Sequence, residues 1–184
     1  MELVRAASLT GYFAVAAELQ VQTLPLLRRA GLSRTMMSDP EQMLPARSVV
    51  HLLEDTADVS GCSTVGLRMA ERRQLSDIGL ISLLIVHQPT LGDALEVLNE
   101  YRTRINSNLT LQIEHHGDAI FLREHFSLQR PLYSRQVNDL ALGVLYKLCR
   151  SVMSGNGRRS RAARSPASFA ASVRPATGRT SASP

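Results

Sequence analysis

Apolar residues recur at regular spacing up to Val152, and this regularity ends abruptly after Met153. Residues 154–184 are mostly serine, alanine and arginine, and they contain six arginines and no acidic residue. Such a segment buries too little apolar surface to offset the entropy lost on ordering, so we expect it to be disordered. The chain is therefore expected to comprise one folded domain, residues 1–153, and a tail, residues 154–184.

The positive charge of the chain belongs to this tail. The formal net charge is +5, but without the six tail arginines residues 1–153 carry fifteen basic and sixteen acidic residues. Arginines can contact phosphates nonspecifically, but phosphate contacts alone read no base sequence. One interpretation of the chain is thus a small interaction module whose basic, disordered tail makes nonspecific contacts with nucleic acid or acidic partners.

The folded part shows mainly helical periodicity. Apolar residues spaced three and four apart predict helices, and Thr90 followed by Asp93 is typical of a capped helix start. The predicted helices cover residues 1–20, 24–30, 45–60, 65–70, 90–105 and 133–152. Gly31 and Gly61 follow two of them, where a left-handed C-terminal cap is common.

The period changes to two between the last two helices. Leu109, Leu111 and Ile113 alternate with polar residues, and His116, Gly117 and Asp118 are typical of a turn into a second strand. A two-stranded ribbon is marginal unless helices or further strands cover it. We therefore expect an α+β fold, rich in helices, with a small antiparallel β-hairpin or sheet.

The longest apolar run, IGLISLLIVH from Ile78, is about half the roughly 20 residues that a membrane-spanning helix needs. We therefore expect it to be buried in protein and expect no membrane span. The N-terminus lacks a basic region followed by a clean apolar run, and the two cysteines, Cys62 and Cys149, form no CxxC motif. These features predict a reduced, cytoplasmic protein.

Three histidines, His115, His116 and His125, raise the question of a metal site. Neighbours on a strand point to opposite faces, which separates His115 from His116. With the turn at residues 117 and 118, His125 lies opposite Thr110, roughly 15 Å along the hairpin from His115 at about 3.3 Å per residue. We therefore expect no metal site.

Motifs for catalysis and cofactor binding are missing from the sequence. Neither cysteine belongs to a recognisable Cys/His signature, no GxSxG sequence occurs, and the glycines form neither a GxGxxG nor a GxxxxGK[ST] phosphate loop. Cys149 lies near an apolar stripe and is expected to fill a small space in the core. We therefore expect no enzyme activity, no catalytic residues and no cofactor.

Residues 76–108 combine a large apolar surface with a few interspersed polar groups. Small-molecule pockets have this composition, although ordinary cores share it. The candidate ligand-binding residues in this stretch are Ser82, His87, Tyr101, Arg102, Arg104 and Asn106.

Four segments together resemble a known family. They are LLRRAGL (26–32), GLRMAERRQLSDIGLIS (66–82), QPTLGDAL (88–95) and SRQVNDLALGVLYKLCRSV (134–152). Their order and spacing resemble the N-terminal, arabinose-binding-type domain of AraC-type bacterial transcription regulators, over about residues 6–153. The resemblance implies a domain that senses a small-molecule effector and dimerises, placed ahead of helix-turn-helix motifs that bind DNA. It does not imply arabinose as the effector.

The segment after Met153 departs from that family pattern. Further sensor strands and a DNA-binding domain are expected there, whereas this chain has the arginine-rich tail and no recognition helix for a major groove. We therefore expect a truncated regulator without sequence-specific DNA-binding residues, which forms a homodimer or pairs with intact subunits. We attribute the tail to an out-of-frame reading of a GC-rich gene. Genomic DNA whose alternative frames encode neither sensor strands nor a helix-turn-helix would contradict this hypothesis.

Overall fold

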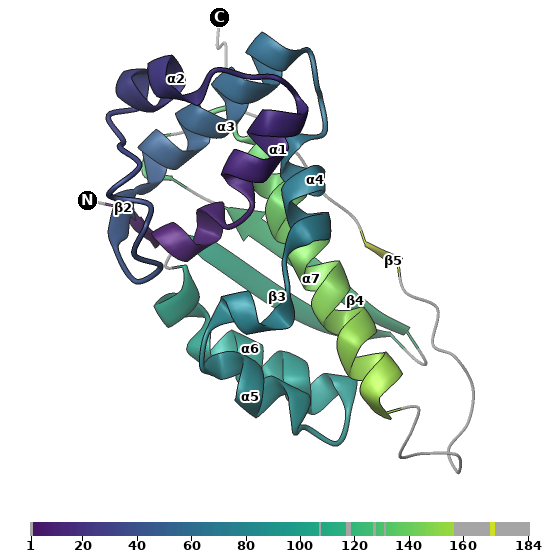
Figure 1. Cartoon of the computed structure of the whole chain (residues 1–184). Coiled ribbons are helices and arrows are strands. Elements are labelled where there is room, and N and C mark those ends of the chain that lie inside the picture. The colour runs from purple at the N-terminus through teal and green to yellow at the C-terminus, as the bar shows by residue number, and fades with distance from the viewer. Residues whose placement is uncertain are drawn as a thin grey trace, which may run out of the picture.

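The computed structural model describes residues 2–106, 108–116, 119–126, 128–130, 132–156 and 170–171. This part contains α-helices, two short 3-10 helices and two small sheets, which confirms the expected helix-rich α+β class (Figure 1). The α-helices are α1 (Tyr12–Glu18), α2 (Thr23–Arg29), α3 (Ala46–Ser60), α4 (Val65–Arg72), α5 (Ile81–Val86), α6 (Leu91–Ile105) and α7 (Arg135–Asn156). The 3-10 helices are η1 (Ala6–Leu9) and η2 (Leu75–Ile78). The strands are β1 (Leu3–Arg5), β2 (Met43–Pro45), β3 (Leu109–His116), β4 (Ala119–Phe126) and β5 (Ala170–Ala171).

The prediction of one helix over residues 1–20 is wrong. This segment divides into β1, η1 and α1, and Gly11 precedes α1 with a left-handed backbone, φ +88°. Such a φ interrupts a helix and suits glycine best. β1 pairs antiparallel with β2, and Val4 lies opposite Leu44 in the core. The apolar spacing was therefore produced by three shorter elements that bury their side chains in the same core.

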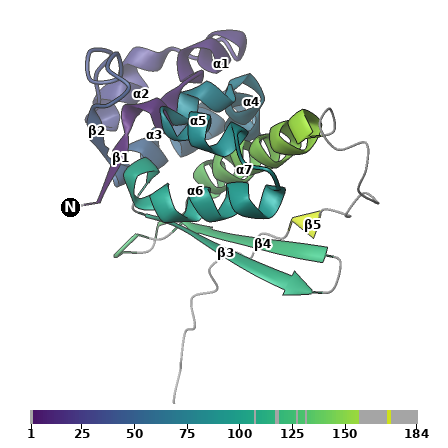
Figure 2. The same cartoon turned by 90° about the horizontal axis from the view of Figure 1, so that it is seen from below.

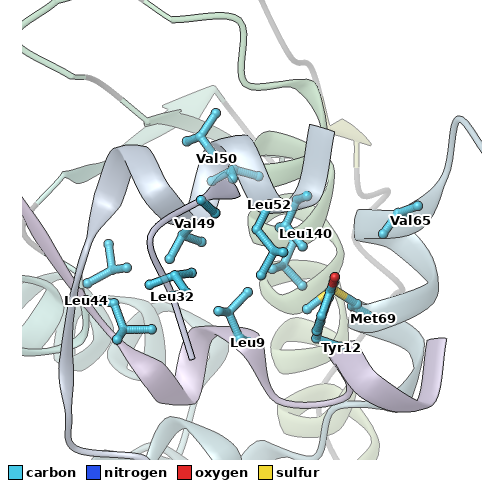
Figure 3. Packing of buried hydrophobic residues seen from close by; sticks show 14 of the residues in the cluster. Leu9, Tyr12, Leu32, Leu44, Val49, Val50, Leu52, Val65, Met69 and Leu140 are labelled. Carbon is cyan, nitrogen blue, oxygen red and sulfur yellow. The ribbon is translucent and has the colours of Figure 1, made fainter. Parts of the chain in front are cut away.

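The largest core cluster joins α1–α4 and part of α7. Tyr12, Met69 and Leu140 come from three of these helices and lie together in Figure 3. The hydroxyl of the fully buried Tyr12 lies 3.1 Å from the Thr56 hydroxyl, which in turn donates to the Leu52 carbonyl at 2.6 Å. The polar groups in this core therefore have partners, as buried hydroxyls require.

Helix α7 connects this cluster to the hairpin. It packs against α4 at one end, and its other half lies beside α6 and β4 (Figure 1). The Gln136 side chain at its start accepts from the Gly66 amide at 3.0 Å and donates to the Ser63 carbonyl at 3.2 Å. These two bonds fix the register of α7 against the start of α4.

The hairpin has the predicted register, with Thr110 opposite His125. Helix α6 lies over one of its faces (Figure 2). Leu111 and Leu122 on that face are buried in a cluster with Leu95, Leu145 and Cys149. The hairpin is thus covered by α6 and α7, as a two-stranded ribbon requires. The predicted turn at Gly117 and Asp118 lies outside the described residues.

Helix α7 continues to Asn156, three residues beyond Met153. Beyond α7 the structure describes only Ala170–Ala171, which pair parallel with β4 at Phe121 and Leu122. The expectation that the rest of the tail is disordered falls outside the described residues.

The expectation that the apolar run around α5 is buried is wrong for half of its side chains. Ile78 and Ile85 are buried, but Leu80 is 84% and Leu83 58% exposed, and Leu84 and Val86 are exposed as well. A helix of two turns presents only one face to the core, so an apolar run of this length also leaves apolar surface outside. Among the described residues, no helix combines the length and apolar character needed to cross a membrane.

Candidate ligand cavity

A cavity of about 130 Å³ lies where the N-terminal segment, α6, the hairpin and α7 meet. Its walls are mostly apolar. Helix α7 contributes Val137, Leu140, Ala141, Val144, Leu145 and Leu148, and the hairpin contributes Leu109, Leu111 and Phe126. These segments lie far apart in the sequence, so the cavity exists only in the assembled fold. An apolar hollow with a few charged groups is the usual form of a small-molecule site.

Arg5 and Arg73 are two of the three arginines that line this cavity, and the third, Arg102, lies on α6. Arg5 ends β1, and Arg73 follows α4. Arg73 donates to the Ala7 carbonyl at 2.8 Å and to the Ser8 carbonyl at 3.2 Å, and Arg5 donates to the Ile78 carbonyl at 3.3 Å. These bonds to backbone carbonyls hold both guanidinium groups in place without neutralising their charge.

The charge of Arg73 has little compensation. No described carboxylate lies within ion-pair distance of it, whereas Arg5 pairs with Glu41 at the surface. Burial lowers the pKa of Arg73, Asp77 raises it, and the positive charge of Arg5 lowers it further. Burial and the proximity of Arg5 both disfavour the charged form of Arg73. An anion bound nearby would offset this effect and would itself be stabilised by the two arginines.

Three buried polar atoms of cavity-lining residues lack a hydrogen-bond partner among the described residues. They are Nε of Arg5, Nε of Arg73 and Oγ of Ser8. A buried donor without a partner costs about 1–3 kcal/mol, so such atoms are uncommon away from binding sites. All three atoms belong to residues that line the same cavity.

Glu124 is the only charged residue on the described inner face of the hairpin. The register places it opposite Leu111 and between Leu122 and Phe126, all of which face the helices. Its side chain keeps intermediate exposure because it borders the cavity, yet burial raises the pKa of its carboxyl to about 7. Near neutral pH this carboxyl is therefore about half protonated, and the neutral form donates as well as accepts a hydrogen bond.

Residues 21–170 match the model of the arabinose-binding domain found at the N-terminus of AraC transcription regulators. The chain belongs to this family. The resemblance found in the sequence is thus confirmed, although the matched range begins later than residue 6 and continues past Met153. The family consists of transcription-regulator domains and not of enzymes.

Two relatives carry the same name. Each is the HTH-type transcriptional regulator VirS, from one of two strains of Mycobacterium tuberculosis. Each is 29% identical to this chain over 111 residues, which is 60% of this chain and 33% of the relative. The chain thus spans about a third of the length of the relatives that it matches.

Two of the six candidate ligand-binding residues of this AraC-type domain line the cavity. Arg102 and Asn106 do so at the end of α6. Ser82 is buried but donates to the Gly79 carbonyl at 2.7 Å, and His87 is exposed at the end of α5. Tyr101 is half-buried and does not line the cavity. The side chain of Arg104 lies outside the described part of the structure.

The sequence reasoning missed the residues that give the cavity its charge. Arg5 lay in a segment predicted as helix, and Arg73 lay in a charged loop where solvent exposure was the natural assumption. Glu124 did carry a signal, since it occupies an inward position between Leu122 and Phe126 in the alternating pattern. A charged residue at such a position is a functional candidate because burial of an unpaired carboxylate is costly.

The histidines of the hairpin are not brought together. The register places His125 beside Thr110 and His115 beside Ile120, at opposite ends of the ribbon. Within the described ranges, no three side chains of the metal-binding types form a group that could hold an ion. Cys149 is 2% exposed in the core, and burial raises the pKa of its thiol to about 11, as expected for a packing residue.

Proposed function

We propose that this AraC-type domain binds a small-molecule effector in the cavity and serves the sensing step of a cytoplasmic transcription regulator. The observation that carries the proposal is the apolar cavity with unpartnered buried donors of Arg5, Ser8 and Arg73. The family to which the chain belongs supports the regulatory role. The VirS relatives are named HTH-type transcriptional regulators, which supports DNA binding as the output of the complete regulator.

The position of the cavity suggests how binding would act. Its walls come from β1, η1, α6, the hairpin and α7. A ligand that contacts all of them stabilises the arrangement in which they enclose it and thereby shifts the population toward that arrangement. Helix α5 packs on α6 and α7, so its orientation would follow this shift.

The proposal includes pairing with a second copy of the chain or with an intact regulator subunit. The exposed leucines of the α5 segment, Leu80, Leu83 and Leu84, together with Val86, support a self-association surface there. Exposed apolar patches on folded domains commonly mark such interfaces. Pairing through α5 would connect the effector cavity to the geometry of a dimer.

Filling the cavity is expected to abolish effector binding. Ala141 lines the cavity on α7, so the Ala141→Phe side chain would occupy the space that an effector needs. The test measures thermal unfolding of the full chain with octanoate, 1-octanol, octylamine and L-arabinose. A ligand at a hundred times its Kd adds about 2.7 kcal/mol, or a Tm rise of about 5–10 °C for a domain of this size. We expect such a rise for the wild type and none for Ala141→Phe.

The matched control is Ala17→Phe, which adds the same ring to an exposed position on α1 outside the cavity. This variant is expected to keep the full ligand-induced Tm rise. Circular dichroism of both variants without ligand establishes that they are folded. A Tm rise of equal size in wild type and Ala141→Phe would place binding elsewhere and contradict the proposed function.

Placing a charge on the α5 surface is expected to weaken the dimer. Leu83 and Leu24 are both 58% exposed, but Leu24 lies on α2, away from α5. We expect Leu83→Asp to raise the dimer dissociation constant by about 10- to 100-fold, because a desolvated carboxylate opposes burial of the interface. Leu24→Asp should leave that constant unchanged. Sedimentation velocity over a concentration series measures the dimer dissociation constants of the wild type and both variants. Equal constants for Leu83→Asp and the wild type would exclude α5 as the interface.

A further inference from the structure

We propose that the cavity takes an apolar monocarboxylate, with the carboxylate at Arg5, Ser8 and Arg73 and the apolar body along α7 and the hairpin. This inference rests on the proposed function, because it names the class of effector for the same cavity. It follows from the charge, the unused donors and the shape of the cavity.

The first support is the charge at the N-terminal wall. Arg5 and Arg73 both line the cavity, and the only described ion pair between them and a carboxylate joins Arg5 to Glu41, whose side chain is 72% exposed. Asp77 also lines this region, but it accepts from the Gln74 amide at 2.8 Å and closes the capping box of η2. A buried positive charge without a close partner is costly. One negative charge on the ligand would offset that cost.

The second support is the set of unused donors. Nε of Arg5 and Nε of Arg73 are buried without partners, and both guanidinium groups are already fixed by bonds to backbone carbonyls. The Ser8 hydroxyl is a third buried group without a partner. A carboxylate has two oxygens that accept several bonds, so it matches two guanidinium N–H groups and a hydroxyl. An alcohol or a sugar would satisfy donors but would leave the charge unbalanced.

Glycine at position 79 permits this arrangement. Gly79 has φ +89°, and a Cβ placed on it would lie 3.4 Å from Nη2 of Arg5. The Arg5 guanidinium therefore lies close to Gly79, whose left-handed backbone suits glycine best. The bond from Arg5 to the neighbouring Ile78 carbonyl places the guanidinium beside η2.

The third support is the apolar remainder of the cavity. Ala141, Val144 and Leu148 form a continuous strip along α7, opposite Leu109 and Leu111 of the hairpin. The cavity volume of about 130 Å³ is well above the roughly 10–15 Å³ that a single water needs, so the cavity has room for a small organic molecule. A carbohydrate of that size would leave its hydroxyls against apolar walls, which is unfavourable.

Glu124 does not oppose an anionic ligand below neutral pH. It lies on the hairpin wall, and burial keeps its carboxyl mainly protonated below its pKa of about 7. Arg102 of α6 also lines the cavity and adds a further positive charge to its walls. The cavity therefore favours an anion over a cation at pH 6.

The experiment measures the affinity of the full chain for four probes at pH 6 by isothermal titration calorimetry. Octanoate and 4-phenylbutyrate carry a carboxylate on a chain or a ring, and 1-octanol and octylamine are the neutral and cationic controls. Octanoate is expected to bind about 10- to 100-fold more tightly than 1-octanol, the range of charge-assisted hydrogen bonds, and octylamine least tightly. Comparison of octanoate with 4-phenylbutyrate distinguishes a chain from a ring as the apolar body.

Variants assign this preference to the arginine wall. Arg73→Met is expected to lower octanoate affinity by about 10- to 100-fold and to leave 1-octanol affinity unchanged. Ser8→Ala removes a hydroxyl that has no partner, so it should leave the unfolding midpoint unchanged while it lowers octanoate affinity by about 3- to 10-fold. The matched control, Arg72→Met, removes a neighbouring exposed arginine that pairs with Glu18 and should not change octanoate binding.

Equal affinities of the wild type for octanoate and 1-octanol would overturn the inference. So would octanoate affinities of Ser8→Ala and Arg73→Met within about twofold of the wild-type value, the usual uncertainty for independent sites. If L-arabinose raises the wild-type Tm, Ala141→Phe abolishes that rise and octanoate has no effect, the carboxylate inference fails and the proposed function stands. If octanoate binds Ala141→Phe as tightly as wild type, both fail.

Discussion

Replacing Gly66 by alanine is expected to lower the free energy of unfolding by about 3 kcal/mol, at the upper end of the range for overpacked positions. A Cβ on Gly66 would lie 2.0 Å from the Gln136 carbonyl oxygen and 2.9 Å from the Leu140 amide nitrogen. Both are backbone atoms of α7, so no side chain can rotate out of the way. The added methyl group would force α4 and α7 apart.

Gly92→Ala is the matched control for this prediction. Gly92 lies in the first turn of α6, and a Cβ there would meet only the Thr90 hydroxyl oxygen, at an ordinary 3.6 Å. Alanine favours helix over glycine by up to about 1 kcal/mol, so this variant should be neutral or slightly more stable. Urea unfolding of the full chain, monitored by circular dichroism, measures both. A Gly66→Ala protein as stable as the wild type would show that α4 and α7 do not pack this closely.

The contact between α4 and α7 also connects stability to the cavity. A Cβ on Gly143, further along α7, would lie 2.5 Å from the Cβ of Ala70, so the two helices approach closely at two points. Arg73 follows directly after α4, while α7 supplies the apolar wall. The close packing of these helices therefore sets the distance between the charged wall and the apolar wall of the cavity.

Elements with a strong local signal were predictable from the sequence. The Thr90 hydroxyl accepts from the Asp93 amide at 3.1 Å, as the capping pattern predicted. Gly31 and Gly61 both adopt positive φ at helix ends, as left-handed caps require. The hairpin register followed from the alternation and the position of its turn. In each case the information lies within a few residues of the chain.

The errors arose where distant contacts decide the structure. β1 is a strand because β2, far along the chain, pairs with it, and no pattern within residues 3–5 predicts that pairing. The apolar run around α5 is half exposed because a short helix docks with one face only. The site shows the same limit. Arg102 and Asn106 came from a continuous stretch, whereas Arg5 and Arg73 become neighbours only in the folded molecule.

Glu124→Gln is expected to stabilise the protein at pH 8 by up to about 3 kcal/mol, or about 6–12 °C in Tm for a domain of this size. Burial raises the pKa of the Glu124 carboxyl from 4.5 to about 7. The folded state thus binds a proton that the unfolded state releases between these values, and stability falls as the pH rises through that window. The resulting penalty is absent well below pH 4.5 and complete above about pH 7. Glutamine has a similar shape and no charge to bury.

The groups around Glu124 explain why its charge is not compensated. Arg102 of α6 and the arginines of the N-terminal wall line the same cavity, but none of them lowers the pKa of this carboxyl. On α7, the Cys149 thiol is neutral, and Glu124 helps to raise its pKa to about 11. The hairpin neighbours Leu122 and Phe126 are apolar. Ionisation of Glu124 is therefore opposed mainly by the loss of water.

Thermal unfolding at pH 5 and pH 8 tests this prediction. The wild type and Glu124→Gln should differ by no more than about 1 kcal/mol at pH 5 and by about 3 kcal/mol at pH 8, because only the wild type loses stability across the window. Glu114→Gln, on the outer face of the same hairpin, is the matched control. Its carboxylate pairs with Arg123 at the surface, so its loss should change stability by at most about 1 kcal/mol at either pH. Parallel pH profiles of wild type and Glu124→Gln would show that Glu124 ionises as readily in the folded protein as in the unfolded chain, and would remove the buried carboxyl from the description of the cavity.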